Sequence, residues 1–206
     1  MERFDLIVIG TGSGLEVSAA AAEAGWRVAV VEEGPFGGTC LNCGCIPSKM
    51  LVHVADVAQT IRKAERFGIH GTIESVDWPA IVERTFADID RDAAAIREGN
   101  RRTERITVFE GRARFVGHKH LEVGDAQISA ETIVIAAGTR PSVPKVEGLA
   151  EAGFETTDTV MRIPKLPRRV VILGGGFVGA EMAHVFGSLG CEVTIVTRGP
   201  AMMRDE

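Results

Sequence analysis

The sequence predicts an α/β protein, because the order strand, glycine-rich turn, helix, strand occurs twice among its 206 residues. The predicted strands are short apolar runs at residues 6–9, 28–31, 170–173 and 193–196. An apolar helix lies between the two strands of each pair, so each copy is a βαβ unit. Two such Rossmann-like units, the second truncated, indicate two bound dinucleotides.

The glycine-rich turns are typical of phosphate binding. The first Gly makes the tight turn, the second lets the backbone approach a pyrophosphate, and the third lets the helix pack on the strand. The second turn has all three, at Gly174, Gly176 and Gly179. The first turn has Gly10 and Gly12, but Leu15 occupies the third position, with Gly14 beside it. Glu32 ends the second strand, where an acidic side chain is placed to accept hydrogen bonds from a ribose diol.

Three further stretches lie between the two units. Residues 47–64 read as a helix with Pro in its first turn. The charged helix 79–102 is expected to form a solvated outer face. Residues 106–137 alternate apolar and polar positions, which predicts an antiparallel meander ending in a buried strand at 133–135. The Pro-rich stretch 141–167 is a natural domain connection.

Composition narrows the class of protein. The 23 basic and 28 acidic residues are interspersed, with a net charge of -5, so nucleic acid is an unexpected partner. The chain shows no secretory signal and no apolar stretch long enough to cross a membrane. A cytoplasmic protein is therefore expected, without a membrane partner.

Three of the four cysteines form a cluster. Cys40, Cys43 and Cys45 lie within six residues, whereas Cys191 stands apart. Because structural disulfides are rare in reducing compartments, such a cluster indicates a catalytic or a metal-binding role. In the metal alternative, the three thiolates would bind zinc or an iron–sulfur cluster with Cys191 or His53 as the fourth ligand.

The segment Gly37–Lys49, read as GGTCLNCGCIPSK, resembles the class I pyridine nucleotide-disulfide oxidoreductases. This family includes glutathione reductase, dihydrolipoamide dehydrogenase, mercuric reductase and mycothione reductase, and the resemblance covers the whole chain. The family's redox pair is C-x4-C, which falls here on Cys40 and Cys45. Cys43 occupies a position that is usually apolar, so we expect it to be a bystander, with no metal bound.

The resemblance implies a role for each cysteine of the pair. Cys45 would be the thiolate that faces the flavin, and Cys40 the interchange thiol that attacks the substrate. The helix dipole beyond Pro47 and the nearby Lys49 would favour the Cys45 thiolate.

The same resemblance implies the remaining cofactor contacts. Thr39 would contact the phosphate–ribitol region of FAD, and Ala113 its adenine. Lys49 would lie beside the flavin with Glu181 as its partner, and Phe177 would cover the flavin until the nicotinamide arrives. Gly138 belongs to the short motif that ends the first FAD segment.

The expected function is electron transfer from NADPH through FAD and the Cys40–Cys45 disulfide to a low-molecular-weight disulfide. Several further stretches resemble mycothione reductase in particular: residues 10–14, 49–51 with 55–58, 158–163 and 183–186. Dihydrolipoamide dehydrogenase-like and mercuric reductase-like enzymes are the alternatives. A further alternative lies outside the enzymes: a fragment that binds nucleotides but has no activity.

The resemblance also implies a domain division. Residues 1–145 would be the first segment of an FAD-binding domain, and 146–206 a truncated NAD(P)-binding domain. The dimerisation domain of the homodimeric parent enzyme would be absent. We therefore expect these residues alone to bind FAD weakly and to reduce no disulfide.

The preference for NADPH rests on the end of the second unit. Counted from Gly25 and Gly190, Glu32 corresponds to Thr197, which neither binds a ribose diol nor repels a 2′-phosphate. Arg198 and Arg204 follow, and guanidinium groups suit phosphate oxygens.

Overall fold

The computed structural model describes residues 1–203, which form two compact units. The first unit contains Met1–Gly44 and Asp88–Ser142, and the second contains Cys45–Ala87 and the chain from Val143 onward. Arg204 lies outside the described residues. These units are defined by compactness, so the expected division of cofactor binding at residue 145 stays a prediction.

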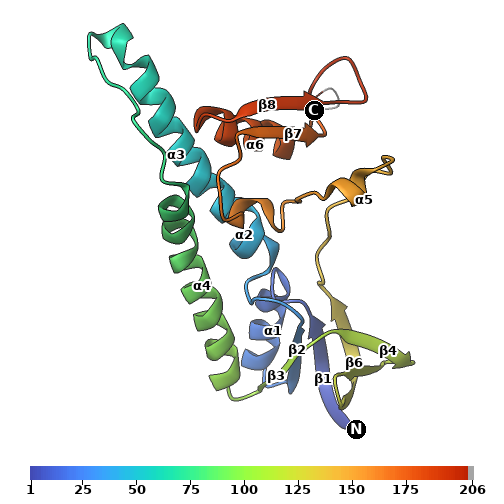
Figure 1. Ribbon diagram of the computed structural model, residues 1–206. Coiled ribbons are helices and arrows are strands. Elements are labelled where there is room, and N and C mark those ends of the chain that lie inside the picture. The colour runs from blue at the N-terminus through green and yellow to red at the C-terminus, as the bar shows by residue number, and fades with distance from the viewer. Residues whose placement is uncertain (204–206) are drawn as a thin grey trace. The chain divides into compact units, whose positions relative to one another are not determined.

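The first unit is a six-stranded mixed sheet with helices (Figure 1). Its elements are β1 (Glu2–Ile9), α1 (Gly14–Glu23), β2 (Val28–Glu32), α2 (Gly38–Cys43), the later part of α4 (Trp78–Arg102), β3 (Ile106–Glu110), β4 (Ala113–Gly117), β5 (His120–Val123) and β6 (Ala126–Ile135). The strand order is β3-β2-β1-β6-β5-β4, in which β1 pairs in parallel with β2 and β6. The predicted α/β class with an antiparallel insertion is confirmed.

Two details of the predicted meander are wrong. Strand β3 pairs in parallel with β2, so the antiparallel part contains only β4, β5 and β6. The segment 133–135 is not buried, and Ile135 is 68% exposed. The reason is that β5 pairs only with residues 126–129 of β6, so the rest of β6 has a strand partner on one side alone.

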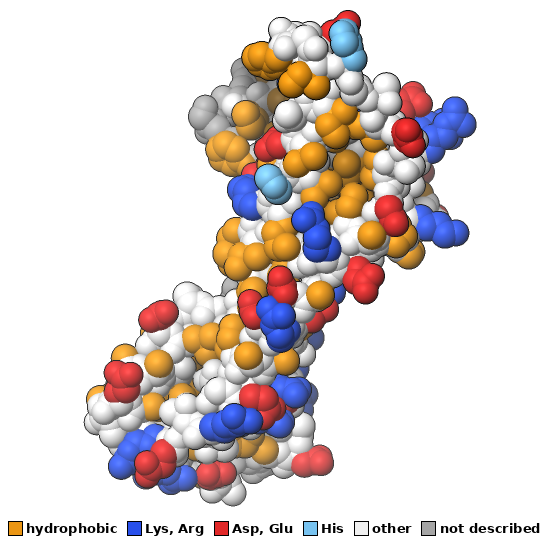
Figure 2. All heavy atoms as spheres, turned by 90° about the vertical axis from the view of Figure 1, so that its left-hand side faces the viewer, with side chains coloured by type: hydrophobic (Ala, Val, Ile, Leu, Met, Phe, Trp, Pro, Cys, Tyr) orange, Lys and Arg blue, Asp and Glu red, His pale blue; other side chains and the backbone are white. Residues whose placement is uncertain are grey.

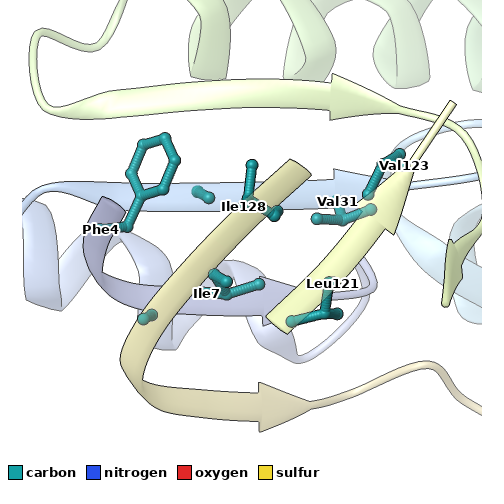
Figure 3. Close-up of a cluster of buried hydrophobic side chains, with 8 residues drawn as sticks. Phe4, Ile7, Val31, Leu121, Val123 and Ile128 are labelled. Atoms are coloured by element: carbon teal, nitrogen blue, oxygen red, sulfur yellow. The ribbon is translucent and has the colours of Figure 1, made fainter. Parts of the chain in front are cut away.

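The parallel strands bury apolar side chains on both faces, as expected when a sheet is covered on both sides. On one face Ile7 and Val31 pack against Leu121, Val123 and Ile128 of the meander, which point into one shared core (Figure 3). The other face packs Leu6, Val8, Val28 and Val30 with Ala22 of α1 and Phe36. This double burial fixes the carboxyl ends of β1 and β2, where the candidate site begins.

The second unit contains a two-stranded parallel sheet and the helices around it. Its elements are α3 (Cys45–Lys63), the 3-10 helix η1 (Ala64–Phe67), the start of α4, α5 (Leu149–Ala152), the 3-10 helix η2 (Val160–Arg162), β7 (Arg169–Leu173), α6 (Phe177–Ser188) and β8 (Glu192–Val196). Buried Trp78 packs against Phe186 and donates a hydrogen bond from Nε1 to the carbonyl of Ile163 at 2.7 Å. Val171 and Val196 of the small sheet are largely exposed.

Helix α4 differs from the expected solvated face. Phe86 in the second unit and Ile89 and Ala93 in the first are each at most 6% exposed. These apolar positions recur at helical spacing, so α4 has one buried side. The many charged residues between them made this apolar side difficult to recognise in the sequence.

Charged side chains of both signs are mixed on the face that Figure 2 shows, and neither sign forms a continuous patch there. Among residues 1–203, no helix combines the length and apolar character that a membrane span requires.

Candidate active site

A cleft of about 720 Å³ opens in the first unit at the carboxyl ends of β1 and β2, the place where Rossmann-type sheets bind ligands. The cleft is lined by most of the residues predicted for the first cofactor, and by the predicted catalytic residue Cys40. The cofactor residues are Gly10, Gly12, Glu32, Thr39, Ala113 and Gly138. The structure thus brings together residues that are more than 100 positions apart in the sequence.

Gly14 takes the packing role that the sequence pattern assigns to the third glycine. A Cβ atom on Gly14 would lie 2.8 Å from Cγ1 of Val8 and 3.1 Å from Cβ of Ala136. Helix α1 can therefore approach β1 closely although Leu15 occupies the formal third position. Gly14 thus compensates for the absence of glycine at position 15.

A second close approach shapes the floor of the cleft. A Cβ atom on Gly38, whose φ is +68°, would lie 2.5 Å from the Cα of Gly12. Bare backbone of the first turn and of the α2 start therefore meet with no side chain between them. Such a surface fits a pyrophosphate, which binds free N–H groups at a helix N-terminus.

Glu32 lines the cleft and is held by Thr11, a residue that sequence reasoning missed. Glu32 Oε2 accepts hydrogen bonds from the backbone N–H of Thr11 at 2.9 Å and from its hydroxyl at 2.6 Å. The Thr11 hydroxyl also accepts a bond from the N–H of Gly37 at 3.2 Å. Buried Thr11 thus ties the glycine-rich turn to the end of β2 and to the loop before α2. No sequence signal marks it beyond its place between two glycines.

Two arginines at the edge of the cleft were also not predicted. Arg140 pairs with Glu33 at 3.0 Å, and Arg112 lies 3.9 Å from the same carboxylate. All three residues line the cleft, so positive charge is available at its rim for an anionic ligand.

Cys40 and Cys45 form a disulfide, whereas Cys43 and Cys191 lie outside it. The bond joins Cys40, the third residue of α2, to Cys45, the first residue of α3. A Cβ atom on Gly44 would lie 2.8 Å from the carbonyl oxygen of Thr39, so only glycine lets the chain turn back this tightly. The expected redox pair is confirmed as a disulfide, and it uses two of the three sulfurs that the metal alternative requires.

Lys49 and Glu181 form a salt bridge between α3 and α6, within the second unit. Both side chains remain partly exposed, at 60% and 36%. The partnership that the resemblance implies is therefore present, and its role toward a flavin stays a proposal.

A second polar pair joins the same two helices, and sequence reasoning missed it. His184 Nε2 lies 2.8 Å from Asp56 Oδ1, and its Nδ1 lies 3.4 Å from the hydroxyl of buried Ser188. Gln59 donates to the same hydroxyl at 2.9 Å. No chemical motif surrounds His184 in the sequence, so sequence alone favours an ordinary surface or packed histidine.

The second glycine-rich turn lies between β7 and α6. Gly174 has φ +126°, Gly176 precedes the first residue of α6, and a Cβ on Gly179 would lie 2.3 Å from the carbonyl oxygen of Gly174. Phe177 begins α6 and is 62% exposed. Thr197 directly follows β8, and its hydroxyl donates to the Gly199 carbonyl at 2.6 Å. Arg198 is exposed.

Cys191 is a buried apolar-type residue. Burial raises the pKa of its thiol, because a thiolate is poorly solvated there. Among the residues from 1 to 203, no group of three or more His, Cys, Asp and Glu side chains is arranged to hold a metal ion.

The fold and the site define a class: a protein of two Rossmann-type units that carries a disulfide beside a glycine-lined cleft. The chain belongs to the pyridine nucleotide-disulphide oxidoreductase family, whose model matches residues 4–206. Members of this family use FAD and NAD(P)H as cofactors.

Known relatives cover the chain almost completely. It is 44% identical to mycothione reductase of Mycobacterium tuberculosis (strain H37Rv) over 99% of its length and 46% of that protein. Dihydrolipoyl dehydrogenase of Chlamydia muridarum is 39% identical over 95% of the chain and 43% of that protein. The HOCl-induced flavoprotein disulfide reductase RclA from Escherichia coli matches with a TM-score of 0.85 and 29% identity, over 98% of this chain and 44% of RclA. The chain spans less than half the length of these relatives.

Proposed function

We propose that the protein transfers electrons from NADPH through FAD to the Cys40–Cys45 disulfide, which then reduces a low-molecular-weight disulfide. The observation that carries this proposal is that Cys40 lines the same cleft as Glu32 and the glycine-rich turn. This shared lining supports a redox role for the disulfide beside a bound dinucleotide.

The residues of the cleft fit FAD. Gly12 and Gly38 leave backbone open to a pyrophosphate, Glu32 presents a carboxylate to a ribose, and Thr39 and Ala113 line the wall. When bound, FAD and the nicotinamide supply the hydride chemistry, while the protein supplies position and electrostatics. Lys49, paired with Glu181, is the proposed cation beside the flavin.

The cysteines perform the disulfide chemistry. In the reduced pair, the Cys40 thiolate attacks one sulfur of the substrate disulfide, forms a mixed disulfide and expels one substrate thiolate. The Cys45 thiolate then attacks the Cys40 sulfur, expels the second substrate thiolate and restores the Cys40–Cys45 bond. Cys45 is the first residue of the 19-residue helix α3, whose N-terminus favours the thiolate form.

The proposed substrate is mycothione or a related small disulfide, supported by the 44% identity to a mycothione reductase. A dihydrolipoyl dehydrogenase-like activity is the second candidate, supported by 39% identity to such an enzyme. We further propose a cytoplasmic homodimer in which residues 1–145 bind FAD and residues from 146 onward bind NADPH.

The test uses the complete protein that carries this chain. Purified with its flavin, it is assayed for NADPH oxidation with mycothione, glutathione disulfide, lipoamide and Hg(II) as acceptors. We expect mycothione to give the highest kcat/KM, Cys40→Ser and Cys45→Ser to abolish turnover, and Cys191→Ser to retain it. Turnover that survives both substitutions in the pair would refute the proposal, and the highest kcat/KM for lipoamide would favour the second candidate.

A further inference from the structure

Cys43 is the cysteine of the cluster that the proposed function does not use. We propose that Cys43 is a third redox-active thiol, which attacks the Sγ atom of Cys40 and exchanges with the Cys40–Cys45 disulfide. The products are a Cys40–Cys43 bond and a Cys45 thiolate.

The position of Cys43 supports this exchange. Cys40 and Cys43 lie three residues apart on α2, so their side chains are neighbours on one side of the helix. Both residues line the same cleft in the first unit. Their C-x2-C spacing is one that thiol–disulfide oxidoreductases use. Neighbouring Cβ atoms at this spacing lie about 5–6 Å apart, against roughly 3.5–4.5 Å in a disulfide, so α2 has to tighten by only an ångström or two.

The leaving group explains why Cys40 is the sulfur attacked. Breaking the bond at Cys40 releases Cys45, and a thiol whose thiolate is stabilised leaves faster. Cys45 begins α3, a helix of 19 residues whose dipole stabilises a negative charge there. Attack on Cys45 would instead release Cys40, which lies inside the six-residue helix α2.

The exchange is balanced without a further reactant. Cys43 gives its proton to solvent, one S–S bond forms as another breaks, and the electron pair of the broken bond leaves on the Cys45 sulfur. No net oxidation or reduction occurs. Because the Cys40–Cys43 form lacks the proposed redox pair, it is a reversible inactive state. This consequence rests on the proposed function, whereas the exchange itself does not.

The test maps disulfide connectivity in the complete oxidised protein. The protein is incubated at mildly alkaline pH and quenched with acid, and its thiols are then alkylated with a first reagent. The disulfides are next reduced, and the cysteines they release are alkylated with an isotopically different second reagent. Trypsin releases residues 28–49 as one peptide with all three cysteines, since no Lys or Arg lies between Arg27 and Lys49. Fragmentation by mass spectrometry then shows which cysteine was a thiol before reduction.

We expect the reagent added before reduction to label Cys45 in a fraction of the molecules, and this fraction should grow with the incubation time. This fraction should be lost in Cys43→Val, which restores an apolar residue, and kept in the control Cys191→Ser. In Cys45→Ser incubated with glutathione disulfide, which accepts the two electrons and leaves as two glutathione thiols, a Cys40–Cys43 bond should form. The proposal is overturned by a first label that stays confined to Cys43, or by failure of Cys45→Ser to form that bond. The readout requires no turnover, so a failure of the proposed function would be seen separately in the NADPH assay.

Discussion

Glu32 and Thr197 occupy equivalent positions in the two βαβ units. The N–H of Gly10 donates to the carbonyl of Val31 at 2.8 Å, and the N–H of Gly174 donates to that of Val196 at 3.0 Å. The residue after each acceptor is therefore the equivalent one, a glutamate in the first unit and a threonine in the second. At this position the second unit has Thr197, whose side chain carries no carboxylate to repel a 2′-phosphate.

This equivalence predicts the nucleotide preference. We expect Arg198→Ala to lower kcat/KM for NADPH by about 10- to 150-fold, equivalent to about 1.5–3 kcal/mol, with little change for NADH. Thr197→Glu should shift the preference toward NADH by restoring an acid. The measurement is kcat/KM for both nucleotides in the complete protein, with exposed Arg91→Ala as the control. Equal losses for NADPH and NADH would show that Arg198 does not bind the phosphate.

Thr11 gives a prediction about FAD affinity. Thr11→Val keeps the shape of the side chain but removes the hydroxyl that joins Glu32 to the N–H of Gly37. We expect the Kd for FAD to rise by roughly 10-fold, since a lost hydrogen bond to a charged group costs about 1.5 kcal/mol or more. Thr11→Ser retains the hydroxyl and should bind FAD nearly as the wild type does. Isothermal titration calorimetry of the FAD-free proteins measures the Kd for FAD. An equal rise in this Kd in Thr11→Val and Thr11→Ser would contradict a role for the hydroxyl.

The two Rossmann-type units could be predicted because local patterns specify them, whereas the Cys40–Cys45 pair was implied by the resemblance of residues 37–49 to the family. Strand, glycine turn and helix recur at short range, and C-x4-C lies within six residues. The role of Thr11 could not be predicted, because its hydroxyl meets Gly37 only after the chain folds. The parallel pairing of β3 was missed for a similar reason: alternation along a strand gives no direction for its partner.

Packing at Gly14 gives a prediction about stability. Gly14→Ala places a methyl group 2.8 Å from Cγ1 of Val8, so α1 has to move away from β1. We expect the free energy of unfolding to fall by about 1–3 kcal/mol. Gly99 offers a matched control: it lies in α4 and a Cβ there meets no atom within 4 Å. Gly99→Ala should leave stability unchanged or raise it by up to about 1 kcal/mol. Urea unfolding measures the free energy of unfolding of both variants. An unchanged free energy of unfolding in Gly14→Ala would contradict close packing of α1 on β1 at Gly14.

The Lys49–Glu181 pair has a structural control in the Asp56–His184 pair, which joins the same helices. Because both pairs are partly exposed, breaking either should change stability by no more than about 1 kcal/mol. Only Glu181→Gln is expected to lower kcat, on the order of 100-fold, because it alone removes the partner of the proposed flavin-side cation. His184→Asn should keep kcat. Matching kcat losses in the two variants would mean that the pairs act only by docking α6 on α3.

In the proposed function, nicotinamide electrons reach the Cys40–Cys45 disulfide through bound FAD. The most direct measurement adds NADPH anaerobically to the complete flavin-containing protein, quenches with acid, alkylates the thiols and maps the labels. Because Cys40 is disulfide-bonded both before and after the proposed exchange with Cys43, we predict that Cys40 becomes alkylated only when FAD and NADPH are both present. A Cys40–Cys45 bond that stays intact after NADPH has been consumed would contradict the account.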